Sequence, residues 1–160
     1  MEYIIHKHGN GRLALGPDHP DYADYLYWFH FTNGSLQPAL GRIMVVASLN
    51  VDDSNPMKQS MNTRLEDALK LVDERVKKNT WLAGKEFTAA DVMIVFSFTT
   101  MRLFTPLDLS SYSGILEYLK RIGERKAYKT AMEKGDPGMK PFLGAESPEL
   151  FEPLRLLRSK

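Results

Sequence analysis

The sequence predicts an all-α fold, and three observations support this prediction. Thr88 and Asp91 have the spacing of a capping box, in which the Thr88 side chain accepts a hydrogen bond from the Asp91 N–H and the Asp91 carboxylate accepts one from the Thr88 N–H. The segment that follows is nearly all apolar, which is typical of a helix in the middle of a core. No stretch alternates apolar and polar residues as a half-buried strand does. We therefore expect a bundle of about five to six helices around a capped, buried core helix.

The first 20 residues predict the end of a helix and then a linker. Residues 1–8 are apolar at positions 3 to 5 and are followed by the stop signal Gly9-Asn10-Gly11. Residues 9–20 read as an extended linker. Pro20 suits the first turn of the next helix, where its missing N–H is not needed.

Residues 21–49 predict a long helix that is rich in aromatic side chains. Asn33-Gly34 and Pro38 lie inside it and predict a bend or a break near its middle. Residues 57–78 predict an amphipathic helix, because its apolar residues recur at helical spacing. These residues are Met57, Met61, Leu65, Ala68, Leu69, Val72 and Val76.

The other face of the helix over residues 57–78 carries mixed charges, and we expect water to cover it. Two pairs, Glu66–Lys70 and Asp73–Lys77, have the favourable order for ion pairs four residues apart. The charged residues are Arg64, Glu66, Asp67, Lys70, Asp73, Glu74, Arg75, Lys77 and Lys78.

The rest of the chain predicts one central and several smaller helices. The capped core helix is expected over Ala89–Leu103. Shorter helices follow over residues 113–124 and 126–134. In the tail, residues 139–160, a peripheral helix is possible over Ser147–Leu157, because Ser147 can cap it with Pro148 behind.

Composition excludes several classes of function. The chain has 160 residues and a formal net charge of +1, which gives no electrostatic reason to expect nucleic acid or an anionic membrane as a partner. It has no Cys, so disulfides, a thiolate nucleophile and a Cys-ligated zinc are excluded, and a reducing cytoplasm fits. His6 and His8 lie close together without an acidic neighbour, so no metal site is expected. No apolar run is long enough to span a membrane.

Three segments together resemble the C-terminal helical domain of the glutathione S-transferase family. Trp81-Leu82-Ala83-Gly84 through Asp91 matches the segment where that family shows its capping box. Residues 22–38 look like the first helix of the domain in fungal and bacterial members. Arg125-Lys126-Ala127-Tyr128-Lys129 looks like the family's Arg-Pro-Ala-Tyr segment, with Lys126 in place of Pro. The resemblance covers residues 1–138 and leaves out the tail.

This resemblance implies a division of labour between two domains. Residues 1–8 would be the end of the last helix of a thioredoxin-like domain, residues 9–20 the linker, and residues 21–138 the helical domain. In the family the thioredoxin-like half holds glutathione, the co-substrate, and stabilises its thiolate. No catalytic residue can therefore be assigned in this chain, and the main glutathione site is expected to lie outside it.

The function implied is that of the electrophile-binding and dimerising half of an enzyme that conjugates glutathione to small electrophiles. Such a half is expected to be inactive alone and to form a homodimer in the full-length protein. The alternative is a non-catalytic helical domain that binds other proteins, because one fold hosts several functions.

The resemblance also places a hydrophobic substrate cleft near the middle of the long aromatic helix. The residues that map there are His30, Asn33, Gly34 and Gln37, and the opposite wall would come from Thr100 and Leu103. The alternative is that these residues only pack the core or lie on the surface. Thr88 and Asp91 are interpreted as a structural cap and not as a catalytic dyad, because their spacing explains both residues without a substrate.

Overall fold

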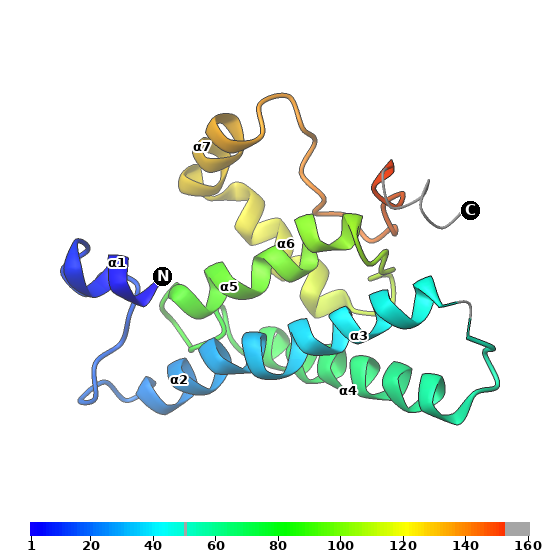
Figure 1. Ribbon diagram of the computed structural model, residues 1–160. Coiled ribbons are helices and arrows are strands. Elements are labelled where there is room, and N and C mark those ends of the chain that lie inside the picture. The colour runs from blue at the N-terminus through cyan, green and yellow to red at the C-terminus, as the bar shows by residue number, and fades with distance from the viewer. Residues whose placement is uncertain (50, 153–160) are drawn as a thin grey trace.

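The computed structural model describes residues 1–49 and 51–152, and it is built from helices (Figure 1). In chain order the elements are α1 (Glu2–Lys7), α2 (Tyr22–Phe31), the π-helical turn η1 (Thr32–Leu36), α3 (Gln37–Ser48), α4 (Pro56–Lys78), α5 (Ala89–Phe98), the 3₁₀ turn η2 (Thr100–Leu103), α6 (Ser113–Glu124) and α7 (Lys126–Gly135). Extended pairing within the described residues is limited to one isolated bridge between Trp81 and Gly84. The predicted all-α fold is confirmed.

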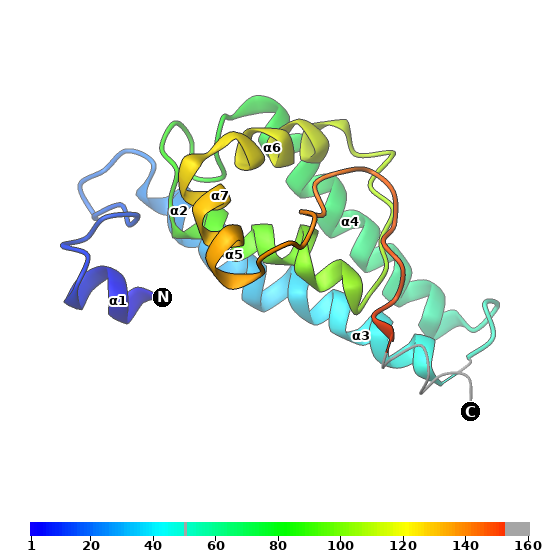
Figure 2. The ribbon, with the colours of Figure 1, turned by 90° about the horizontal axis from the view of Figure 1, so that it is seen from above.

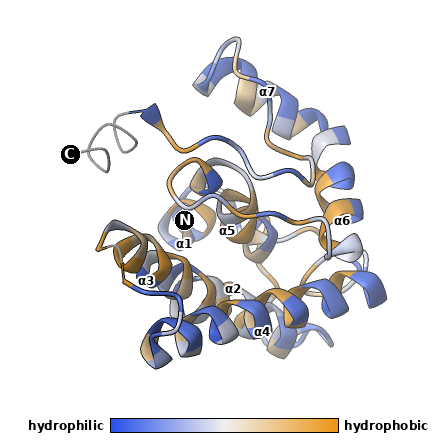
Figure 3. Cartoon of the chain, turned by 90° about the vertical axis from the view of Figure 1, so that its right-hand side faces the viewer, coloured by the Kyte–Doolittle hydropathy of each residue, from blue (hydrophilic) through white to orange (hydrophobic). Residues whose placement is uncertain are grey.

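The helices pack around α5. Helices α2 and α3 form one long rod beside α4, while α5 packs on α2 and α6 packs on α4 (Figure 1). Seen from above, α7 turns back from the end of α6, and α1 stands apart beside the N-terminus (Figure 2). Hydrophobic residues concentrate on α5, whereas much of α7 is hydrophilic (Figure 3). Ile94 of α5 is fully buried, as the core-helix prediction requires.

The long aromatic helix bends without breaking. At its middle the backbone widens into η1, where the Gln37 N–H donates to the Thr32 carbonyl. Pro38 sits in the first turn of α3 and has no N–H to offer the preceding turn. A π-helical turn accommodates this, so α3 continues directly from α2.

The core helix is shorter than the sequence predicted. Helix α5 ends at Phe98, and the predicted range to Leu103 includes the separate turn η2. The helix stops because Thr99 leaves helical geometry, with φ −121° and ψ −97°, while its hydroxyl donates to the Val95 carbonyl at 2.8 Å. One side of the helix is also open, since Val92 and Phe96 are 40% and 48% exposed.

The predicted terminal helix does not begin at Ser147. Residues 147–151 have no helical structure, Glu152 is helical, and residues 153–157 of the prediction lie outside the described residues. The backbone of this segment bonds to the bundle instead of to itself: the Phe151 N–H donates to the Leu103 carbonyl at 2.7 Å. Ser147 therefore caps no helix.

The expectation that water covers the charged face of α4 is wrong for Asp73. Its side chain is buried, and it accepts a hydrogen bond from the Ile115 N–H at 3.0 Å. Asp73 thus caps the first turn of α6 from a neighbouring helix, while it also pairs with Lys77 at 2.5 Å. Gly114 permits this approach, because a Cβ there would lie 2.6 Å from the Asp73 carbonyl oxygen.

None of the described helices is both long and apolar enough to cross a membrane. Across residues 1–49 and 51–152, no group of three or more His, Asp or Glu side chains is arranged to hold a metal ion.

Candidate functional site

The capping box at the start of α5 does more than cap the helix. Asp91 is fully buried, and its Oδ2 accepts from the Thr88 N–H at 2.8 Å, while the Thr88 hydroxyl accepts from the Ala90 N–H at 3.3 Å. Asp91 Oδ1 accepts two further bonds of 2.9 Å, from the Leu82 N–H and the Tyr118 hydroxyl. One carboxylate therefore ties the loop before α5, the start of α5 and the middle of α6 together.

Burial shifts the pKa values of Asp91 and Tyr118, which share a hydrogen bond. It raises the pKa of the Asp91 carboxyl above its usual value, although the hydrogen bonds from Leu82, Thr88 and Tyr118 act in the opposite direction. Burial also raises the pKa of the Tyr118 hydroxyl well above 10.0, and the adjacent Asp91 charge adds to this effect. Both groups are buried inside the bundle, so this arrangement is structural.

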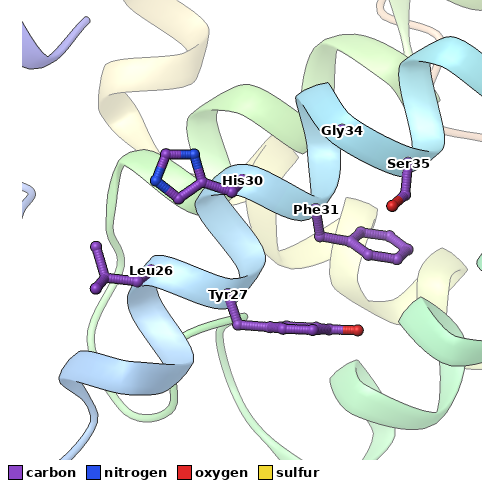
Figure 4. Close-up of a pocket in the computed structure, with 6 residues that line it drawn as sticks. All are labelled: Leu26, Tyr27, His30, Phe31, Gly34 and Ser35. Atoms are coloured by element: carbon purple, nitrogen blue, oxygen red, sulfur yellow. The ribbon is translucent and has the colours of Figure 1, made fainter.

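The predicted cleft residues of the aromatic helix lie on its surface. His30 and Gly34 line an open hollow of about 470 Å³ together with Leu26, Tyr27, Phe31 and Ser35 (Figure 4). In this view Leu26 and His30 project to one side of α2, and Tyr27 and Phe31 project to another. The hollow is shallow and has no enclosing wall from a second helix.

The remaining predicted residues lie elsewhere. Asn33 is exposed, and the Gln37 amide donates to the Ser97 hydroxyl of α5 at 3.3 Å. Thr100 lines a groove on the open side of α5, and Leu103 lines a different hollow against the tail. The helical chain alone therefore does not bring the six residues into one cavity.

An apolar groove lies between the open side of α5 and the start of α7, and we call it the α5–α7 groove. It encloses about 680 Å³, and its walls include Phe87, Val92, Phe96 and Tyr128. Its charged lining consists of two cations, Arg12 and Arg125. Such a surface suits an apolar partner that carries negative charge at its edge.

Arg125 is fixed at this groove by aromatic rings. Its guanidinium carbon lies 3.5 Å from the centre of the Phe87 ring and 5.3 Å from that of Trp81. Cation–π contact of this kind holds the start of α7 against the loop before α5. Trp81, Phe87 and Arg125 all lie in the segments that carry the family resemblance described above. That resemblance was the sequence signal from which the contact could have been predicted.

Arg102 is a buried residue that sequence reasoning missed. It is 1% exposed, and all of its hydrogen bonds go to main-chain carbonyls, those of Leu107, Gly144, Ala145 and Glu146. No local pattern could reveal this role, because three of these acceptors lie more than 40 residues downstream.

The fold and its capping box can now be compared with known proteins. The family model described as "Glutathione S-transferase, C-terminal domain" matches residues 22–126. The chain belongs to the glutathione S-transferase family. The match covers every helix from α2 to α6 and ends at the first residue of α7.

Relatives of this glutathione S-transferase domain are longer than the chain. It is 31% identical over 140 residues to Glutathione S-transferase 1 of Manduca sexta, a match that covers 85% of the chain and 60% of the relative. It is 26% identical over 148 residues to Glutathione S-transferase 3 of Schizosaccharomyces pombe, covering 84% and 60%. The chain thus spans about 60% of the length of these relatives.

Solved structures agree with the fold. A glutathione S-transferase from Actinobacillus pleuropneumoniae matches with a TM-score of 0.70 and 20% identity, over 84% of this chain and 60% of that one. A glutathione transferase from Phanerochaete chrysosporium, solved with oxidized glutathione, matches with a TM-score of 0.62 and 18% identity, over 83% and 62%. At these identities the likeness concerns the fold.

Proposed function

We propose that this glutathione S-transferase domain is the electrophile-binding and dimer-forming half of an enzyme that conjugates glutathione to small electrophiles. The other half would be a thioredoxin-like domain that holds glutathione and stabilises its thiolate, because the thiol itself is a poor nucleophile at neutral pH. The family match over residues 22–126 carries this proposal. A cytoplasmic location follows from it, since glutathione keeps thiols reduced there.

The α5–α7 groove is our candidate for the seat of the thioredoxin-like half. A second hollow of about 370 Å³ adjoins it and shares Arg12 and Leu13 with it. Tyr3 and Ile4 of α1 are 69% and 63% exposed, although both are large and hydrophobic. The linker is fixed beside the groove, because the Ala89 N–H donates to the Leu13 carbonyl at 2.8 Å. A continuous apolar surface of this kind marks a binding interface.

The predicted substrate cleft fits this arrangement. Its residues His30 and Gly34 line a hollow that has one wall, formed by α2 and η1, and Thr100 lines the α5–α7 groove. A docked second domain would supply the opposite wall, which is how many clefts form between domains. His30, Asn33, Gly34, Gln37, Thr100 and Leu103 therefore stay our proposed electrophile contacts.

A homodimer is proposed through α2 and α3. Large apolar side chains on this rod remain exposed, namely Tyr27, Val45 and Leu49, with exposed fractions of 51%, 53% and 65%. A second copy of the chain would cover them.

A chimera tests this function. The chain alone should flow through immobilised glutathione, because the main glutathione site is proposed to lie in the other half. Fused behind the N-terminal part of the Manduca sexta relative that this chain does not match, it should conjugate glutathione to 1-chloro-2,4-dinitrobenzene. Phe96→Asp in the groove should abolish that activity, because a carboxylate would be buried at the domain contact.

Leu71→Asp is the matched control, since Leu71 is 43% exposed on α4, outside the groove. It should leave the chimera active. Tight, glutathione-competed retention of the chain alone would refute the proposed division between the halves. Equal activity of the two Asp variants would refute the groove as the seat. An inactive chimera that folds and dimerises would favour the non-catalytic interaction domain.

A further inference from the structure

The tail after α7 is attached to the bundle in an unusual way. Residues 139–152, which we call the strap, run from the end of α7 back toward the end of α5 (Figure 2). None of their side chains is fully buried, and their apolar contacts with the bundle include the Phe151 ring, whose centre lies 5.5 Å from that of Phe104. Leu143 packs on α6 at Gly123, where a Cβ would lie 2.5 Å from the Leu143 Cδ1 atom.

Arg102 supplies most of the polar attachment. Its guanidinium donates to the carbonyls of Gly144 at 2.9 Å, Ala145 at 3.0 Å and Glu146 at 2.5 Å. Two further backbone bonds join the strap to the bundle, from the Leu109 N–H to Ala145 and from the Phe151 N–H to the bundle. The polar attachment of the strap is thus made by a cation that binds the strap's backbone, and polar side chains of the strap take no part in it.

This kind of attachment favours a strap that can open. Arg102 is 1% exposed, so its guanidinium has lost contact with water, and this burial lowers its pKa. When the strap leaves, water can hydrate the charge again, and this gain offsets part of the lost hydrogen bonding. An apolar contact of equal strength would have no such compensation.

We propose that residues 139–152 form a strap which Arg102 locks over the end of α5, and that the strap opens and closes as one unit while the helical bundle stays folded. The hollow between η2 and the strap encloses about 670 Å³ and is lined by Leu103. Opening of the strap therefore changes the surroundings of the Leu103 side chain. This last consequence rests on the proposed function, because Leu103 is one of the proposed electrophile contacts; the lock itself does not.

Amide hydrogen exchange on the 160-residue chain tests the strap directly. In the unaltered chain the Leu109 and Phe151 amides should share one opening equilibrium, and both should exchange about tenfold or more faster than the Ile94 amide in the middle of α5. Arg102→Met and Arg102→Lys should speed exchange of the Leu109 and Phe151 amides, the two that bond across the strap contact, about tenfold or more again, because neither side chain can bind all the carbonyls. Arg75→Met is the control.

Arg75 suits this purpose because it also binds a main-chain carbonyl, that of Leu82 at 2.8 Å, which is not part of the strap. Arg75→Met should leave unchanged the ratio of the exchange rates of the Leu109 and Phe151 amides to the exchange rate of the Ile94 amide. Strap amides that exchange only together with Ile94 in the unaltered chain would overturn the proposal, and that measurement needs no variant. So would Arg102 variants that speed strap and core amides equally. Since no step uses glutathione, these results are independent of transferase activity.

Discussion

Removal of the Asp91 carboxylate should destabilise the domain far more than loss of an ordinary helix cap. In Asp91→Ala four buried donors lose their acceptor: the N–H groups of Leu82 and Thr88 and the hydroxyls of Thr88 and Tyr118. Each buried donor left without a partner costs about 1 to 3 kcal/mol, and the costs at neighbouring donors do not add fully, so the free energy of unfolding should fall by about 3 to 5 kcal/mol. Loss of an exposed cap alone would cost about 1 kcal/mol.

Urea denaturation followed by circular dichroism at 222 nm measures this difference. A single domain of this size is stable by about 5 to 15 kcal/mol, so the loss should be large but measurable. Asp91→Asn should fall between the alanine variant and the unaltered chain, because one amide oxygen can still accept the bonds from Leu82 and Tyr118. Asp67→Ala, on the exposed face of α4, should change stability by about 0.5 kcal/mol or less.

A double-mutant cycle then isolates the bond between α5 and α6. In Asp91→Ala, Tyr118→Phe removes one of the stranded donors, so the double variant should be more stable than the sum of the two single effects predicts, by about 1 kcal/mol. The reasoning is wrong if Asp91→Ala loses no more than an exposed cap would, or if the two substitutions are simply additive.

Two further predictions concern the same packing. Asp73→Ala should lower the free energy of unfolding by about 1 to 2 kcal/mol in urea, because the Ile115 N–H loses its acceptor; a loss equal to that of Glu74→Ala, which removes an exposed carboxylate, would contradict this. The raised pKa of Tyr118 should make stability fall above pH 10, since the unfolded state releases this proton first and the folded state must follow at higher pH. Thermal melts of Tyr118→Phe should therefore show a smaller loss above pH 10 than the unaltered chain shows.

The helical elements could be predicted because their signals are local. The range of α6 agrees with its prediction over residues 113–124, and α4 begins one residue early, at Pro56. The end of α5 was predicted too late for a local reason, because Thr99 leaves helical geometry while its hydroxyl donates to the Val95 carbonyl four residues back. Residues 147–151 differ from the prediction for another reason, since the Phe151 N–H donates to the distant Leu103 carbonyl instead of to a preceding turn.

The roles of individual polar side chains could not be predicted in the same way. Asp73 looked like one member of a charged helix face, yet it caps a helix that lies 40 residues away along the chain. Arg102 stood among apolar and small residues without any pattern, because its partners are carbonyls that every residue type possesses. Sequence carries no record of a contact whose acceptor is backbone.

The open side of α5 links the sequence pattern to the proposed function. A helix that is apolar on all sides predicts burial on all sides. The bundle covers most of α5, but it leaves Val92 and Phe96 40% and 48% exposed at the wall of the α5–α7 groove. A surface helix of a self-contained bundle would carry polar residues at those positions. A helix that is apolar on all sides but partly exposed in the bundle is therefore what we expect if a second layer covers α5. This exposure favours a docked domain over a bundle that works alone. Phe96→Asp in the chimera tests the choice, because a docked domain would cover the Phe96 side chain and a bundle alone would leave it exposed.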